Sequence, residues 1–336
     1  IFKELLPIKS SFGLDAKGMA RSLLEAFVDG IVNSVTDIDS FIKCTLMSAQ
    51  EEYKAVHSIT KEALTYLQKH EFIEWHPETS VFEPTLLGIA TVYSSLSPSD
   101  GVDTVSELAE ARKQLILDSD LHLVYLITPL HQLIYPNWQI LFRRYNCLSP
   151  NDRRVADRIG VSEAFLVKMN RTVCRSALKV SNSKEERLFK IHQRFYNALL
   201  VSNLMEEIPL RKLAEKHEIS RGQLQSLQSS SCTFAGIITV FCQQLGWWDL
   251  ELLFGRLGHR LNHRVQHDLV PLMSIPHMTA KRARILHDAG FKTVQSIAAS
   301  EAKLLCPHIR SETPFEQKLG KSSTSIARAQ AMRGRE

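Results

Sequence analysis

The sequence predicts a mainly α-helical protein: a winged helix, then a helical bundle with one long central helix, then a small helix-hairpin-helix domain. Three observations predict this fold class. Apolar residues recur every three or four positions through most of the chain, which is the period of helices that bury one face. One short stretch reads as a β-hairpin, and one long run without any charge reads as the central helix. With 336 residues, 44% hydrophobic and 23% charged, the chain is long enough to bury two or three cores.

The winged helix is predicted for residues 15–98, after a linker in residues 1–14. Its predicted elements are helices near residues 20–31, 37–47 and 51–70 and strands at residues 72–75 and 81–84. Three helices and a hairpin make a winged helix, a fold that often binds nucleic acid. Lysines and glutamates are balanced on the third helix, so a structural or docking role is predicted in place of base reading. Pro84–Ala90 and Ser94–Ser99 are predicted to mark the boundary of this domain.

The helical bundle is predicted for residues 99–265. Its helices are expected at Val105–Leu117, His122–Ile127, Trp138–Arg144, Asn151–Ile159, Ser162–Met169, Glu185–Met205 and Leu210–His217, followed by the long central helix and by Trp247–His263. Loop residues at Leu148–Pro150 and Val180–Ser183 separate these helices, as is typical of a bundle.

The long central helix has clear start and stop signals. Ser220 and Gln223 fit the Ser-x-x-Gln capping box, and Gly246 supplies the left-handed residue that ends a helix. Apolar or small residues step by three and four and predict one buried stripe, made of Leu224, Leu227, Ser231, Phe234, Ile238, Phe241 and Leu245. At about 1.5 Å per residue the helix is expected to be on the order of 35–40 Å long.

The other side of this helix is polar but uncharged, since no Asp, Glu, Lys or Arg lies between Arg221 and Asp249. A solvated helix normally carries charge there. Neutral hydrogen-bonding groups, and a small Ala235–Gly236 step, suit a helix that lines a channel for a polyanion. The alternative is a central helix enclosed by its own domain. For the first alternative the predicted contacts are Arg221, Gln225, Ser226, Gln228, Ser229 and Thr233.

The third domain is predicted for residues 266–306, with a helix at Arg264–Leu272 leading into it. Ala280–Asp288, Gly290 and Thr293–Ala298 read as helix, hairpin and helix. Backbone amides of such a hairpin can hold a phosphate, with Lys281, Arg282 and Arg284 adding positive charge; the alternative is a protein contact. Residues 307–336 are read as a basic linker or disordered tail.

Charge and cysteine usage narrow the class of protein. The net charge is +5, but residues 251–336 hold fourteen Lys and Arg against seven Asp and Glu, which favours a polyanionic partner at that end. Six scattered cysteines without a Cys-x-x-Cys pair indicate reduced thiols in the cytosol or nucleus and argue against zinc. No apolar run is long enough to span a membrane, and no signal peptide is expected.

No catalytic residues or bound cofactor are expected in this chain. Gly320-Lys321-Ser322 is not a P-loop, because Phe315 stands where the leading glycine is needed and no apolar strand precedes it. An acidic metal-and-water motif for ATP hydrolysis is likewise missing from the sequence. The chain begins with Ile1 and not with Met, so it reads as part of something longer.

The order of these domains resembles the non-ATPase half of superfamily-two DNA repair helicases. The amino-acid sequence is most similar to the helicase-like region of DNA polymerase theta. The resemblance spans Asp15 to about Ala298. It rests on Leu121–Pro129, Arg194–Tyr196, Arg221–Gln228, Phe234–Gly236, Val240–Cys242, Leu245–Trp247 and Ala283–Phe291. Leu148–Pro150 and Gly160–Glu163 are equally similar to the related stand-alone repair helicase, which is the near alternative.

The resemblance implies that two RecA-like motor domains precede this chain and bind ATP and Mg, and that the parent acts in the nucleus in double-strand-break or crosslink repair. It also implies that the long helix is the ratchet helix, along which single-stranded DNA moves. Archaeal relatives carry an arginine and a stacking tryptophan on that helix, at positions that correspond to Ser226 and Thr233 here. The resemblance therefore implies a hydrogen-bonding track without base stacking. A helical protein-interaction scaffold that does not bind DNA is the alternative from another class.

Overall fold

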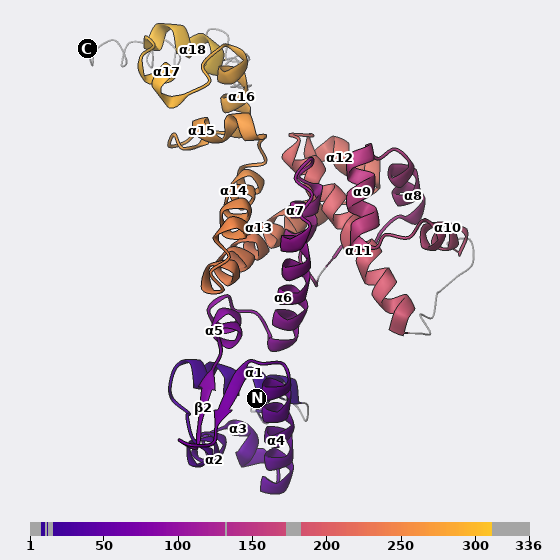
Figure 1. Ribbon diagram of the computed structural model, residues 1–336. Helices are drawn as coiled ribbons and strands as arrows, with labels where there is room; N and C mark the ends of the chain where they lie inside the picture. Colours follow the sequence, from indigo (N-terminus) through magenta and orange to yellow (C-terminus); the bar gives the residue numbers. More distant parts are fainter. Residues whose placement is uncertain (1–7, 11, 13–15, 132, 173–182, 311–336) are drawn as a thin grey trace, which may run out of the picture. The chain divides into compact units, whose positions relative to one another are not determined.

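The computed structural model describes residues 8–10, 12, 16–131, 133–172 and 183–310 (Figure 1). The chain divides into two compact units. Residues 1–202 and 211–258 form the first, and residues 203–210 and 259–336 form the second. Helices dominate the described residues of both units, and the only sheet in them has two strands. The predicted mainly α-helical fold class is confirmed.

The first unit begins with the predicted winged helix. Its elements are α1 (Ala16–Val28), α2 (Val35–Lys43), α3 (Leu46–Gln50), α4 (Tyr53–Lys69), β1 (Ile73–His76) and β2 (Val81–Pro84). The strands pair antiparallel with Trp75 opposite Phe82, and the two rings lie 4.5 Å apart. Helix α1 packs along α4 and against β2. This packing buries Leu23, Phe27 and Phe72 to 1% exposure or less.

The single helix predicted at residues 37–47 is wrong, because the chain forms two helices there. Thr45 has extended backbone, and its hydroxyl accepts a hydrogen bond from the amide of Ser48. The same hydroxyl donates to the carbonyl of Ile42 at 2.8 Å. Thr45 thus ends α2 and caps the N-terminus of α3. The spacing of apolar residues, from which the single helix was predicted, does not reveal such a cap.

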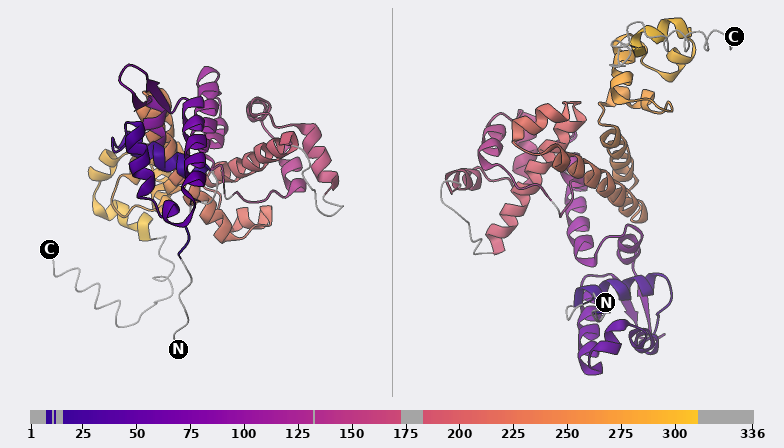
Figure 2. Two further views of the ribbon diagram at one scale, coloured as in Figure 1. Left: turned by 90° about the horizontal axis from the view of Figure 1, so that it is seen from below. Right: turned by 180° about the vertical axis from the view of Figure 1, so that it is seen from behind.

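Of the two segments predicted to mark a boundary after the winged helix, Pro84–Ala90 lies largely in a helix, whereas residues 94–97 of Ser94–Ser99 form the turn between two helices. Helix α5 (Leu86–Tyr93) is capped by Thr85, and α6 (Pro98–Lys113) is capped by Ser97 with Pro98 in its first turn. Helix α5 contacts α1, β2, α6 and α13, and the right-hand view of Figure 2 shows this short helix between the winged helix and the end of α13. Helix α5 lies very close to the backbone before β1, because a β-carbon on Gly88 of α5 would collide with the backbone carbonyl of Phe72.

The rest of the first unit is the predicted bundle. Its further helices are α7 (Leu121–Ile127), α8 (Trp138–Asn146), α9 (Pro150–Ile159), α10 (Glu163–Thr172), α11 (Ser183–Met205), α12 (Leu210–His217), α13 (Arg221–Gln244) and α14 (Trp248–His263), of which α11, α12 and α14 extend into the second unit. Arg194 ties α11 to the end of α7. It is 5% exposed and donates to the carbonyls of Thr128 at 2.9 Å and Leu126 at 3.1 Å. These carbonyls end a helix and need such donors.

Helix α13 is the long central helix that the sequence predicts. The Ser220 hydroxyl accepts from the Gln223 amide, and the Gln223 side chain accepts from the Ser220 amide, which completes the capping box. Gly246 follows the helix at φ 70°. The 24 residues correspond to a length of about 36 Å. Of the predicted stripe, six residues are buried, namely Leu224, Leu227, Ser231, Phe234, Ile238 and Phe241, and Leu245 is half-buried.

The second unit contains the short elements η1 (His267–Leu269), α15 (Val270–Met273), α16 (Ala280–Asp288), α17 (Val294–Ala298) and α18 (Ala302–Arg310). The helix predicted at residues 264–272 begins too early, because Arg264 has φ 54° and the helical residues, those of η1 and α15, start at His267. Helix α16 is as predicted, with Gly290 after it at φ 98°. The tail predicted from residue 307 begins too early, because α18 runs through Pro307 to Arg310. Residues 311–336 lie outside the described part.

Candidate nucleic-acid interface

The polar flank of α13 is open to solvent. Gln225, Ser226, Ser229 and Thr233 are exposed, as is Arg221 at the start of the helix, while Gln228 is half-buried. The alternative of a helix fully enclosed by its own domain is therefore wrong. The buried stripe holds α13 in its unit and leaves the opposite side as a surface of neutral hydrogen-bonding groups.

Hydroxyl groups of this flank already donate to the helix backbone. Ser230 donates to the carbonyl of Ser226 at 2.7 Å, and Thr233 donates to the carbonyl of Ser229 at 3.1 Å. Each hydroxyl oxygen keeps acceptor capacity for a ligand. Gln225 offers both amide donors and a carbonyl acceptor, so the flank supplies donors and acceptors without any formal charge.

The surface of α13 also lacks aromatic rings among the described residues. Phe234 is 8% exposed and Phe241 is 0% exposed, since both belong to the buried stripe. The two cysteines of the helix are not thiolates, because burial raises the pKa of Cys232 to about 11 and that of Cys242 to about 12. Neither stacking nor charge attraction can therefore come from the middle of this helix.

An arginine of α6 reaches the turn between α13 and α14. The Arg112 guanidinium lies 5.4 Å from the ring centroid of Trp247 and 3.3 Å from a carboxylate oxygen of Asp249. Trp247 is half-buried beneath it, whereas the next residue, Trp248, is exposed. Sequence reasoning named neither Arg112 nor Trp248 as a candidate, although an aromatic pair directly after a helix-ending glycine was a signal that could have been noticed.

The helix-hairpin-helix does not present its three predicted cations equally. Lys281 is exposed and Arg282 is half-buried. Arg284 donates to Glu207 at 2.6 Å and to Asp268 at 2.7 Å, and these two hydrogen bonds raise the pKa of its guanidinium. Arg284 is thus held inside the second unit, and Lys281 is the cation that this turn offers to a ligand.

The first turn of α16 is partly capped by its own chain. The Thr279 hydroxyl accepts a hydrogen bond from the Arg282 amide at 3.2 Å, and an Arg282 guanidinium nitrogen donates to the carbonyl of His277 at 3.4 Å. The amides of Ala280 and Lys281 precede these bonds and face the N-terminus of the helix. Such amides and the helix dipole favour an anion at that end.

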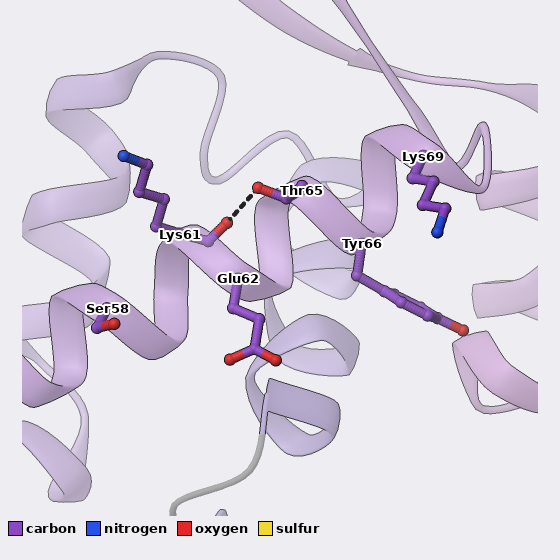
Figure 3. Close-up of a pocket in the computed structure, with 6 residues that line it drawn as sticks. All are labelled: Ser58, Lys61, Glu62, Thr65, Tyr66 and Lys69. Atoms are coloured by element: carbon purple, nitrogen blue, oxygen red, sulfur yellow. Dashed lines mark hydrogen bonds between the residues drawn. The ribbon is translucent and has the colours of Figure 1, made fainter.

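A shallow open hollow lies along α4 of the winged helix. Its lining residues are Ser58, Lys61, Glu62, Thr65, Tyr66 and Lys69. Figure 3 shows that they come from successive turns of one helix, with Glu62 between the two lysines along it. The mixture of charges does not form a continuous cationic surface, and no constellation for catalysis is present in this hollow.

Metal and membrane sites are not evident in the described part of the chain. It contains no group of three or more His, Cys, Asp or Glu side chains placed to hold a metal ion. Among the described helices, none combines the length and the apolar character that a bilayer crossing needs.

Comparison with known proteins supplies the family. Residues 98–261 match the helical domain of the DNA polymerase theta helicase-like region, residues 1–74 match a helix-turn-helix domain, and residues 267–333 match a domain of unknown function. The chain is 36% identical over 318 residues to DNA polymerase theta of Drosophila melanogaster, covering 90% of this chain and 15% of that protein.

Two further relatives carry helicase names. Helicase POLQ-like of Homo sapiens is 27% identical over 303 residues, covering 86% of this chain and 27% of that protein. ATP-dependent DNA helicase Hel308 of Pyrococcus horikoshii is 28% identical over 118 residues, covering 34% of this chain and 16% of that protein. The chain thus spans between 15% and 27% of the length of these three relatives. By its winged helix, its helical domain and these matches, the chain belongs to the family of the helicase-like region of DNA polymerase theta, which is related to the POLQ-like and Hel308 helicases.

Proposed function

We propose that α13 guides single-stranded DNA through an ATP-dependent DNA helicase that acts in double-strand-break or crosslink repair. The observation that carries this proposal is the exposed, uncharged flank of a helix whose opposite stripe is buried. The names of the relatives, two of them helicases and one a DNA polymerase, support DNA as the ligand. A repair function of this kind places the parent protein in the nucleus.

In this proposal Arg221 meets a phosphate where the strand enters, and the track continues along Gln225, Ser226, Gln228, Ser229 and Thr233. A neutral hydrogen bond contributes about 0.5–1.5 kcal/mol net. The track therefore holds the strand through several weak contacts that form and break as it advances. Lys281 and the first amides of α16 add a phosphate contact at the helix-hairpin-helix.

The chemistry of the helicase belongs to other domains of the parent. RecA-like motor domains would bind ATP and Mg and drive the strand along α13, while this chain would supply the surface on which the strand moves. Support for this division comes from the ATP-dependent Hel308 relative. The near alternative is a stand-alone helicase of the same family. The 27% identity to Helicase POLQ-like supports this alternative less than the 36% identity to DNA polymerase theta supports a parent of the polymerase theta type.

The test is the affinity for a fluorescent single-stranded oligonucleotide measured over a salt series. We expect affinity to fall as salt rises, with a log–log slope of several, because cations that contact phosphates release counterions. The double variant Gln225→Ala/Ser229→Ala should bind about 5- to 50-fold more weakly at every salt concentration, with the slope unchanged, since it removes neutral bonds only.

Gln139→Ala is the matched control, because Gln139 is also an exposed glutamine on a helix but lies on α8. It should leave affinity unchanged. Gln228 is a poorer choice for the variant, because it is half-buried and its replacement would also disturb packing. Binding that is absent, or indifferent to salt, would instead support a protein-interaction scaffold.

A further inference from the structure

The aromatic group that the flank of α13 lacks is present on the next helix. Trp248, the first residue of α14, is 77% exposed, and Leu252, one turn later, is 56% exposed. Tryptophan is on average a highly buried residue, so an indole this exposed points to a ligand surface. Trp248 makes no ring–ring or cation–π contact with the described residues, whereas Trp247 lies under Arg112.

Small residues bring α14 against α13. A β-carbon on Gly258 would lie 3.3 Å from the β-carbon of Ala235, and one on Gly255 would lie 3.9 Å from a methyl carbon of Thr239. As the residue number rises on one helix it falls on the other, so the two helices run antiparallel from the turn at Gly246. This order places Trp248 and Leu252 beside the C-terminal end of α13, near Gln243.

The burial pattern puts these side chains on the same outer surface as the flank. On α14, Leu250, Phe254 and Leu257 are buried and face the interior, Gly255 and Gly258 face α13, and Trp248, Leu252 and Arg256 are exposed. On α13, the buried stripe faces the interior, Ala235 and Thr239 face α14, and Ser229, Gly236 and Gln243 are exposed. The two helices lie side by side, and each buries one face in the interior of the unit. The faces opposite to the interior therefore point the same way and form one continuous exposed surface.

We propose that Trp248 and Leu252 form a stacking platform for bases of the single strand that lies on the flank of α13, and that Arg256 contacts a neighbouring phosphate. The inference rests on the proposed function, because it needs the strand to follow α13. A flat indole can stack on any base and therefore suits binding without sequence preference. Asp249, the acidic residue beside Trp248, is paired with Arg112, which reduces its repulsion of the strand.

The experiment compares Trp248→Ala with Trp248→Phe on the full chain, using a fluorescent single-stranded oligonucleotide and a matching strand whose bases are removed. Trp248→Ala should lower affinity for the normal strand about 5- to 100-fold without changing the salt slope, because stacking is not a charge contact. Trp248→Phe should restore part of the affinity. Neither variant should change affinity for the abasic strand, and Arg256→Gln should reduce the slope by about 0.7.

Tyr53→Ala is the matched control, since Tyr53 is an aromatic residue 52% exposed on α4. It should bind as the wild type does. If Trp248→Ala binds normally while Gln225→Ala/Ser229→Ala is weakened, the platform is wrong and the track remains; Trp248 and Leu252 would then face a protein partner. If Trp248→Ala weakens the normal and the abasic strand equally, stacking is also wrong. If the wild-type chain does not bind the oligonucleotide, the proposed function itself fails.

Discussion

Arg284 holds both carboxylate oxygens of Glu207, through Nε at 2.9 Å and Nη2 at 2.6 Å. Its third nitrogen, Nη1, donates to Asp268 at 2.7 Å. The Arg284 and Glu207 side chains are only 26% and 21% exposed, so solvent screens the pair weakly. One guanidinium thus joins the middle of α16 to η1 and to the segment at residues 203–210, all within the second unit.

Replacing Arg284 by Gln should lower the free energy of unfolding of the second unit by about 1.5–3 kcal/mol, because two carboxylates lose a charged donor. Lys281→Ala should change stability by less than about 0.5 kcal/mol, since Lys281 is exposed. Urea unfolding measures both. The effects on oligonucleotide binding should be the opposite of the effects on stability. Only Lys281→Ala should reduce the dependence of log affinity on log salt concentration, by about 0.7 in slope. A reduced slope for Arg284→Gln with unchanged stability would contradict this assignment.

Arg194 should be more critical for the first unit than any exposed arginine on the same helix. Arg194 is 5% exposed, and its guanidinium donates to Glu107 at 2.6 Å and lies 4.6 Å from the ring centroid of Tyr125. Arg194→Gln should lower the free energy of unfolding by about 1.5–3 kcal/mol, because two helix-end carbonyls lose a charged donor, while the Glu107 side chain is 38% exposed and can be solvated. Arg187→Gln, an exposed change on α11, is the control and should cost less than about 0.5 kcal/mol.

Gly88→Ala should loosen α5. The added methyl group would collide with the backbone carbonyl of Phe72, and a carbonyl in a packed hairpin cannot move aside cheaply. The expected loss of unfolding free energy is about 1–3 kcal/mol. Gly236→Ala is the opposite case, because nothing lies within 4 Å of the added carbon; it should stabilise α13 by about 0.5–1 kcal/mol. Equal effects of the two substitutions in urea unfolding would contradict the packing described for α5.

The stability of the first unit should increase with pH between about pH 4 and pH 6.5. Burial, and then the nearby Arg144 and Lys216, lower the pKa of His217 to about 4 from its ordinary 6.5. The unfolded chain therefore takes up a proton in this range while the folded chain does not, so acid favours unfolding. Burial lowers the pKa of His122 and His192 in the same direction.

The measurement is urea unfolding at pH 5 and at pH 7. The wild type should be more stable at pH 7. In His217→Gln, which keeps a hydrogen-bonding group near Tyr196 but cannot take up a proton, the difference between the two pH values should shrink. A difference of unchanged size would show that His217 is already protonated in the folded chain at pH 5.

Local signals predicted the helices whose ends are encoded in neighbouring residues. The capping box of Ser220 and Gln223 fixed the start of α13, and the apolar spacing fixed which side of it is buried. The end of α14 at His263 was predicted, but the non-helical residues 264–266 were not, because the positive φ of a non-glycine residue such as Arg264 has no local signature.

Predictions that depended on distant residues were incomplete. The partner of Arg284 stands 77 residues away in the sequence, so nothing near Arg284 indicated that its charge is already used. The exposure of Trp248 depends on how α14 packs against α13, which the spacing of apolar residues does not determine. The candidate track could be located from the sequence, whereas the groups on neighbouring elements could not.

Because α13 has no side chain that titrates near neutral pH, the charge of this helix does not change with pH in that range. Its two thiols keep their protons far into the alkaline range, and no other side chain between Arg221 and Asp249 ionises near neutral pH. A buffer change from mildly acidic to mildly alkaline leaves every group on this surface in the same protonation state. Any acid or alkaline optimum found for a ligand on α13 must therefore originate in the ligand or in a neighbouring element.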